Sequence, residues 1–337
     1  MILAAGFGTR LFPLTIDRTK PAIPFLGKPL VGYVAEYVAK FGFKDLVVNL
    51  HHQPESVREV LGDGTDYGVN IHYTLEKPDI LGTSGALDNA RHLLENETFL
   101  IVNGKIISDI DIAKAVETHK KTGAIATMVL KENAKREKFT EVEVEDGFVK
   151  GFGGFPQQTQ DSRFQIPQSA IRNPQSAIRN PLMFTGIHIL EPRVFDYIPR
   201  GVYSDIVPSF YNPAIRGGEK IAAHITDGNW FELSTIPRYL DISLAMLDGA
   251  DVFVGDDCRI SEKTRVSDSV IWDDVRIEDG ARVHRTIIAD GVRIGRDEEY
   301  ENAAIVRAEM VKNCMEVPEK ALRGKFVGEN YVVPLAR

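Results

Sequence analysis

Cysteine is scarce in this chain. Its 337 residues include only two, Cys258 and Cys314. Two cysteines provide neither a disulfide framework nor a thiolate metal site, because both need several. Such low cysteine use is typical of proteins from a reducing compartment, so we expect a cytoplasmic location.

Long apolar runs are also missing. A membrane-spanning helix needs about 18 or more consecutive apolar residues, and the sequence contains no such run. The first residues, Met1-Ile2-Leu3, carry no basic charge, whereas a signal peptide begins with a basic region. We therefore expect no membrane span, no signal peptide and no membrane partner.

Basic residues do not predominate. The 40 Lys and Arg residues are outnumbered by 48 Asp and Glu, which gives a net charge of −8. This balance argues against a wide basic surface for nucleic acid, so local basic clusters carry more information. With 43% hydrophobic residues over 337 positions, the chain is long enough for about two domains with a sizeable core.

The N-terminal segment carries a phosphate-binding pattern. A short apolar run, Met1 to Ala5, leads into Gly6-Phe7-Gly8-Thr9-Arg10, and Lys20-Pro21 follows ten residues later. Glycine lets a backbone approach a phosphate closely, and Arg and Lys supply positive charge. The segment therefore predicts a nucleotide site. Its apolar run is short for a buried strand, so we expect that a few N-terminal residues are missing from this version of the sequence.

The first 249 residues alternate between strand-like and helix-like patterns, which predicts an α/β domain. The expected fold is a Rossmann-like, mostly parallel sheet with helices on both faces. Ligands of such sheets lie beyond the carboxyl ends of the strands, where residues 6–10 and 103–105 fall. The expected strands are 45–50, 69–75, 98–102, 124–130, 182–190, 221–224 and 230–233, and the expected helices are 30–41, 54–61, 84–94, 110–121, 192–198, 204–211 and 236–247.

The middle of this domain is irregular. Residues 139–151 resemble a β-hairpin with Asp146-Gly147 at its turn. The heptapeptide PQSAIRN then occurs twice in succession, at 167–173 and 174–180. A proline in each copy excludes a coiled coil. We interpret 157–181 as a disordered, duplicated surface insert without a role.

From residue 250 the apolar period changes. Aliphatic residues follow one another at spacings of six, six and five, and the pattern repeats every 17 residues, at positions 254, 260, 266, 271, 277, 283, 288 and 294. Hexapeptide spacing of this kind predicts a short left-handed parallel β-helix over 250–295. Fewer than three coils need support, so we expect docking on the first domain, on a second copy or on a partner subunit. Residues 296–337 are expected to form a cap or tail, and His284 a solvent-facing corner rather than an acyltransferase residue.

Four motifs occur in order along the chain: GFGTRLFPLT with a following KP, ILGTSGAL at 80–87, VNG at 102–104 and WFELSTIPRYL at 230–240. Together with the hexapeptide pattern they resemble the sugar-1-phosphate nucleotidyltransferases, also called NDP-sugar pyrophosphorylases. Residues 48–73 also resemble the bacterial mannose-1-phosphate guanylyltransferase and muramate-phosphate uridylyltransferase branch. The resemblance covers nearly the whole chain outside the insert and the C-terminal segment.

The resemblance implies that a sugar 1-phosphate attacks the α-phosphorus of a nucleoside triphosphate (NTP) and releases pyrophosphate, with Mg²⁺ as cofactor. Arg10 and Lys20 would be catalytic: Arg10 would hold the leaving phosphates and Lys20 would bridge the reacting ones. Thr140 and Gly186 would lie at the sugar. The implied nucleotide contacts are Leu3, Ala5, Gly6, Gly8, Thr9, Glu76, Gly82, Thr83 and Lys105.

The chain departs from the family pattern at the metal site. Family members usually have a metal-binding Asp after Asn-Gly, where this chain has Lys105, and an ammonium cannot bind a hard cation. The second metal carboxylate corresponds to Glu232, a tentative ligand. Either Lys105 partly substitutes for the metal, or the chain is a weakened nucleotide-binding or regulatory homologue. Asp109 and Asp111 are expected to cap the helix at Ile110 rather than to form a shifted metal site. We further expect Arg10, Lys20, Lys105 and Glu232 to converge.

Overall fold

The computed structural model describes residues 1–153, 180–314 and 317–335, so the duplicated insert lies almost wholly outside the described residues. The chain divides into two compact units. The first comprises Met1–Leu81, Val102–Asp109 and Asn229–Arg337, and the second Gly82–Ile101 and Ile110–Gly228. No helix in the described part of the chain is both long and apolar enough to cross a membrane.

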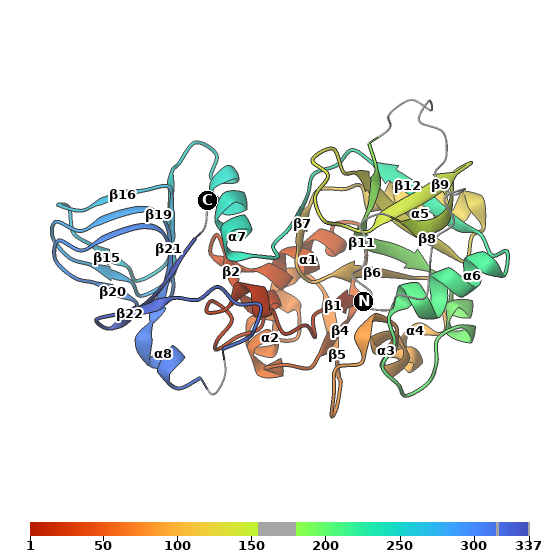
Figure 1. Ribbon diagram of the computed structural model, residues 1–337. Coiled ribbons are helices and arrows are strands. Elements are labelled where there is room, and N and C mark those ends of the chain that lie inside the picture. Colours follow the sequence, from red (N-terminus) through yellow and green to blue (C-terminus); the bar gives the residue numbers. More distant parts are fainter. Residues whose placement is uncertain (154–179, 315–316, 336–337) are drawn as a thin grey trace, which may run out of the picture. The chain divides into compact units, whose positions relative to one another are not determined.

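The first unit contains a parallel sheet around a very short strand, β1 (Ile2–Leu3). Strand β1 pairs in parallel with β4 (Asp45–Leu50) and with β6 (Phe99–Asn103), and β4 pairs in parallel with β5 (Asn70–Leu75). Helices α1 (Leu30–Ala39) and α2 (Pro54–Leu61) alternate with these strands along the chain (Figure 1). The α/β alternation and the parallel pairing predicted for this region are confirmed.

The strands of the second unit pair in mixed directions, and the prediction of mostly parallel pairing is wrong for them. Strand β8 (Ala126–Glu132) pairs in parallel with β12 (Ile221–Thr226) but antiparallel with β11 (Leu182–Leu190). The expected hairpin forms from β9 (Glu141–Glu145) and β10 (Phe148–Gly153), which a two-residue turn can join only as antiparallel neighbours. Strand β10 also pairs antiparallel with β12. The hairpin strand β10 is therefore antiparallel to both of its neighbours.

Several helices of the second unit differ from their predicted bounds. The predicted helix 84–94 is divided into α3 (Gly82–Asn89) and α4 (Arg91–Leu94), and α5 (Ile112–Thr122) begins two residues later than expected. The Asp111 side chain caps α5 by accepting the N–H of Lys114, as predicted. Asp109 has a different role, because its carboxylate accepts the backbone N–H of Asn229 at 2.6 Å. The remaining helical segments are short: η5 (Pro192–Asp196), η6 (Val207–Tyr211) and α6 (Asn212–Arg216).

The 17-residue repeat of the sequence becomes a strand register in the first unit. Parallel pairs join Val252 with Ser269, Arg259 with Arg276 and Arg265 with Arg282, each pair 17 residues apart. The strands therefore stack as successive coils, and Figure 1 shows them side by side at the left. The strands are β14 (Val252–Val254), β15 (Arg259–Ile260), β16 (Arg265–Ser267), β17 (Ser269–Ile271), β18 (Arg276–Ile277), β19 (Arg282–Ile288), β20 (Arg293–Ile294) and β21 (Glu299–Arg307).

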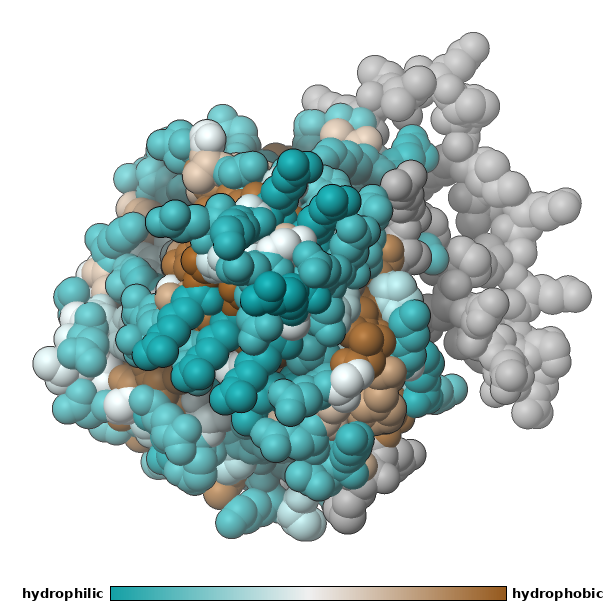
Figure 2. Space-filling model, turned by 90° about the vertical axis from the view of Figure 1, so that its left-hand side faces the viewer, coloured by the Kyte–Doolittle hydropathy of each residue, from teal (hydrophilic) through white to brown (hydrophobic). Residues whose placement is uncertain are grey.

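The coils have an apolar interior and a polar outside. Ile277, Ile288 and Ile294 belong to one buried cluster inside them. The outward residues of β15, β18 and β20 are arginines, and the face of the coils is mostly hydrophilic in Figure 2. His284 is exposed, as expected, with its ring 3.0 Å from the Ser267 hydroxyl.

The chain after the coils folds back on them. Strand β21 pairs antiparallel with β23 (Asn330–Pro334), which pairs antiparallel with β22 (Lys325–Val327). Helix α8 (Ala308–Lys312) lies between β21 and β22 in the sequence. This antiparallel return protects one edge of the stacked strands.

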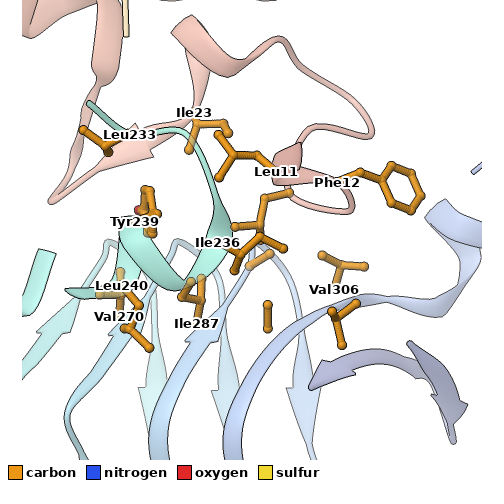
Figure 3. Packing of buried hydrophobic residues seen from close by; sticks show 14 of the residues in the cluster. Leu11, Phe12, Ile23, Leu233, Ile236, Tyr239, Leu240, Val270, Ile287 and Val306 are labelled. Atoms are coloured by element: carbon orange, nitrogen blue, oxygen red, sulfur yellow. The ribbon is translucent and has the colours of Figure 1, made fainter. Parts of the chain in front are cut away.

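One face of the coils packs on the rest of the first unit. Strand residues Val270, Ile287 and Ala304 share a buried cluster with Leu11 and Phe12 of the N-terminal segment. Helix α7 (Ile236–Ala245) contributes Ile236, Tyr239 and Leu240 to the same cluster, and Figure 3 shows Leu240 beside Val270 of the coils. The coils therefore dock within their own chain, which is one of the supports expected for so short a repeat.

Candidate functional site

The glycine-rich segment leaves β1 and enters a short 3₁₀ turn, η1 (Thr9–Leu11). Gly8 has φ +67°, and a Cβ there would lie 3.1 Å from the Cβ of Lys20 and 3.1 Å from Cγ2 of Thr15. Glycine suits this position because an L side chain would be strained at that φ and its Cβ would crowd the Lys20 segment. Gly8 and Lys20 therefore lie side by side, although they are far apart in sequence.

Hydrogen bonds fix the start of this loop to the sheet. Asn49, at the end of β4, accepts the Ala4 N–H at 2.8 Å and donates to Glu76 Oε1 at 2.6 Å. The second oxygen of Glu76 accepts the Leu81 N–H at 2.6 Å. Glu76 is only 1% exposed, and each of its carboxylate oxygens accepts a hydrogen bond from within the chain. Its proposed contact with a nucleobase stays a prediction.

Lys105 and Glu232 form an ion pair. Lys105 lies in the turn between β6 and β7 (Ile106–Ser108), and Glu232 ends β13 (Trp230–Glu232), which pairs antiparallel with β7. Ile106 is the register partner of Glu232, and the Leu233 N–H donates to the Lys105 carbonyl at 3.1 Å. The backbone ladder thus brings the two charged side chains together, so the pair is not a chance surface contact.

The charges of Arg10 and Lys20 act on this pair. Burial together with Lys105 and Arg10 lowers the pKa of Lys20 to about 7, and Glu232 opposes that change. Burial disfavours the Glu232 carboxylate, but Lys105, Lys20 and Arg10 more than compensate and lower the pKa of Glu232. The four predicted residues are therefore close enough to influence one another's protonation, with three bases around one acid.

Two features of the site were missed in the sequence. Phe7 is 45% exposed, and its ring centroid lies 5.5 Å from that of His51 and 5.3 Å from that of His52. An exposed aromatic residue inside a glycine-rich turn is the signal that could have drawn attention to it.

Arg18 was also missed. Its guanidinium donates to Asp290 of the coils at 2.7 Å and lies 5.6 Å from the ring centroid of Trp272. The Trp272 indole donates to the Tyr239 hydroxyl at 3.1 Å, which donates to the Pro24 carbonyl at 2.6 Å. Arg18 therefore ties the segment between Arg10 and Lys20 to the coils, and Tyr239 ties the nearby Pro24 to α7 and the coils.

The remaining predicted residues belong to the second unit. The Thr83 hydroxyl accepts the Ile206 N–H at 2.7 Å, and a Cβ at Gly82 would lie 2.7 Å from the Ser204 carbonyl oxygen. Gly186 is buried with φ +77° inside β11, where the register with β8 shifts, and Thr140 is exposed just before β9. Their roles toward base and sugar stay predictions.

The residues present do not fit the Mg²⁺ site that the family resemblance implies. Mg²⁺ needs oxygen ligands in octahedral geometry. The Glu232 carboxylate is instead paired with an ammonium and surrounded by basic groups. Among residues 1–153, 180–314 and 317–335, no three His, Cys, Asp or Glu side chains are grouped so that they could hold a metal ion.

Two family models match the chain. The nucleotidyl transferase model matches residues 1–249, and the GMPPB C-terminal domain model matches residues 241–331. The first match includes the glycine-rich loop, Lys20, Lys105 and Glu232, and the second includes the stacked coils.

Curated relatives are similar over the transferase region. A UTP–glucose-1-phosphate uridylyltransferase from Synechocystis is 30% identical over 249 residues, or 71% of this chain and 61% of that protein. An N-acetylmuramate α-1-phosphate uridylyltransferase from Neisseria meningitidis is 32% identical over 71% of this chain and 94% of its own length. A mannose-1-phosphate guanylyltransferase from Mycobacterium tuberculosis is 26% identical over 74% of this chain and 64% of its own. The chain thus spans about three fifths of the first and third of these relatives.

A solved structure shares the fold. It is described as a glucose-1-phosphate thymidylyltransferase from Bacillus anthracis in complex with sucrose, and it covers 74% of this chain and 95% of its own with a TM-score of 0.58 and 19% identity. At that identity it shows a common α/β fold. The family model over residues 1–249 and the uridylyltransferase relatives go further, and on them the chain belongs to the nucleotidyl transferase family, among the sugar-1-phosphate nucleotidyltransferases.

Proposed function

We propose that the chain transfers a nucleotidyl group from an NTP to a sugar 1-phosphate, giving an NDP-sugar and pyrophosphate. The observation that carries this proposal is the convergence of Arg10, Lys20 and Lys105 beside the glycine-rich loop of a nucleotidyl transferase chain. Basic side chains grouped around one carboxylate suit an anionic ligand with several phosphates.

In the proposed reaction, a phosphate oxygen of the sugar 1-phosphate attacks the α-phosphorus. A new P–O bond forms while the bond to the β-phosphate bridging oxygen breaks, and pyrophosphate leaves with that electron pair. The backbone of Gly6 to Gly8, with Thr9 and Arg10, holds the departing β- and γ-phosphates. Lys20 neutralises charge at the reacting phosphates, and positioning supplies most of the catalysis.

The other substrate contacts are proposed from the family pattern. Leu3 and Ala5 precede the loop, and Glu76, Gly82 and Thr83 are assigned to the nucleobase side. Thr140 and Gly186 are assigned to the sugar. The ordered Glu76–Asn49–Ala4 hydrogen bonds support this assignment indirectly, because they fix the backbone that would meet the nucleotide.

Residues 1–249 are proposed as the transferase domain and 250–295 as a left-handed β-helix, with 296–337 as its cap. The six, six and five spacing and the parallel 17-residue register support this interpretation. Both cysteines are free thiols, which suits the cytoplasmic location that we propose. We also expect a second copy or another partner subunit to bind the coils.

A weakened binding or regulatory homologue is the second candidate. The Lys105–Glu232 ion pair favours it, because the pair occupies the positions from which the family resemblance expects metal ligands. Such a protein would bind NTP or NDP-sugar without turning it over.

Pyrophosphate release separates the two candidates. The purified chain is incubated with each of ATP, GTP, UTP, CTP and dTTP, paired with glucose, mannose and N-acetylmuramate 1-phosphates, with and without Mg²⁺. Pyrophosphate formation that requires both substrates supports the transferase. Binding of NTP or NDP-sugar without pyrophosphate from any pair supports the binding homologue.

A further inference from the structure

The Lys105–Glu232 pair is built into the backbone. Strand pairing sets Ile106 opposite Glu232, and the Leu233 N–H donates to the Lys105 carbonyl. Backbone hydrogen bonds between β7 and β13 therefore hold Lys105 next to Glu232. The Arg238 guanidinium also donates to the Glu232 carbonyl oxygen at 2.7 Å. The Glu232 side chain is 9% exposed and that of Lys105 is 32% exposed. The carboxylate is therefore buried, while the ammonium reaches the surface.

This arrangement disfavours a divalent cation at Glu232 on chemical grounds. A single carboxylate that is already paired with an ammonium is a weak ligand for a hard cation, and the positive charges of Arg10 and Lys20 repel a cation further. A second carboxylate is missing from this position, because Lys105 stands there. A metal would first have to displace Lys105 from its partner.

The same arrangement favours a phosphate. An ammonium has three N–H donors, and one ion pair leaves donors of Lys105 available at its exposed end. Glu232 orients the ammonium but cannot balance Arg10, Lys20 and Lys105 together. A polyphosphate chain supplies the missing negative charge, and phosphate oxygens accept charge-assisted hydrogen bonds from Lys and Arg.

We propose that the Lys105 ammonium, positioned by Glu232, binds a phosphate of the nucleotide in place of a divalent cation, so that this chain takes up metal-free NTP. The proposal rests on the proposed function for the identity of its ligand. It assigns Glu232 as a positioning residue, which acts by holding Lys105, rather than as a metal ligand.

Equilibrium binding tests the proposal without turnover. Titration calorimetry measures the Kd of ATP, GTP and UTP in EDTA and in excess Mg²⁺. We expect the best-bound NTP to bind at least as tightly in EDTA as in Mg²⁺. Lys105→Met should weaken binding in EDTA about tenfold or more, the size expected for a lost charge-assisted contact. Lys105→Asp should bind NTP only with Mg²⁺, because it creates a carboxylate pair with Glu232.

Two controls guard against misfolding. Lys263→Met removes another paired lysine, which is 76% exposed and bonded to Asp279, and should leave NTP binding unchanged. The double variant Lys105→Met/Glu232→Gln removes both charges, so no buried carboxylate is left unpaired. It should bind NTP as weakly as Lys105→Met while unfolding at the wild-type urea concentration.

The outcomes distinguish this inference from the proposed function. Wild-type NTP binding that requires Mg²⁺, unchanged binding by Lys105→Met, or no NTP binding in either buffer would overturn the inference. Metal-free binding without pyrophosphate release would support it and reject the transferase. Pyrophosphate release that is abolished by EDTA, with NTP binding also lost, would retain the transferase and reject the inference.

Discussion

Replacing Ile287 by alanine tests whether the stacked coils support the glycine-rich N-terminal segment. Ile287 and its neighbour Ile288 are both 0% exposed in β19, but they face opposite sides of the strand. Ile287 belongs to the cluster that contains Leu11 and Phe12, whereas Ile288 belongs to the cluster inside the coils. The two substitutions remove the same atoms from equally buried sites, so Ile288→Ala is a matched control.

The expected loss of stability is similar for both variants. Each substitution removes three buried carbons at about 0.8 kcal/mol each, and the cavity left behind raises the cost to about 3 kcal/mol. Urea denaturation measures this difference in the free energy of unfolding.

The two variants should differ in nucleotide binding. A cavity at Ile287 loosens the segment between Arg10 and Lys20, and a loss of about 1 kcal/mol in phosphate contacts raises the NTP Kd about fivefold. Ile288→Ala should leave the Kd within about twofold of wild type, because its cavity opens toward the coil interior. Calorimetry under conditions where both variants remain folded provides the comparison. Equal effects on Kd, or none from Ile287→Ala, would refute the idea that docking supports the loop.

Three further predictions concern the loop and its supports. Because the pKa of Lys20 is lowered to about 7, its positive charge is present below that pH and is lost above it, so NTP affinity should fall between pH 6 and 8. Lys20→Arg keeps the charge and should remove that part of the pH dependence, and identical pH profiles for the two proteins would contradict the assignment. Gly8→Ala should cost about 1–2 kcal/mol of stability and weaken NTP binding, because of its φ of +67° and its contact with Lys20. Gly6→Ala is the control, since nothing lies within 4 Å of a Cβ there, and equal stability of the two variants would speak against the strain argument. Glu76→Gln should cost about 1–3 kcal/mol in urea denaturation, because an amide N–H₂ would then face either the Asn49 or the Leu81 donor. An unchanged midpoint for Glu76→Gln would mean that this hydrogen-bond network is dispensable.

Local patterns in the sequence were sufficient for the parallel half of the sheet and for the coil period. The strand 45–50 and the helix 54–61 have the bounds that were predicted, because their apolar periodicity and flanking residues are local properties. The mixed strand directions of the second unit were not predictable in this way. Whether β11 runs parallel or antiparallel to β8 depends on a pairing across 50 or more residues, and no local pattern encodes it.

The site residues also divide into those that the sequence identifies and contacts that only the tertiary structure decides. The sequence by itself determined the loop of Gly6 to Arg10, the presence of Lys20 and the presence of Lys105 after Asn103-Gly104, because these are matters of residue type and short spacing. Only the tertiary structure decided that Lys105 pairs with Glu232, 127 positions away in the numbering, and that Ile287 rather than Ile288 faces Leu11. Long-range strand register and the packing of one buried face against another set both contacts, and neither is written in any local stretch of residues.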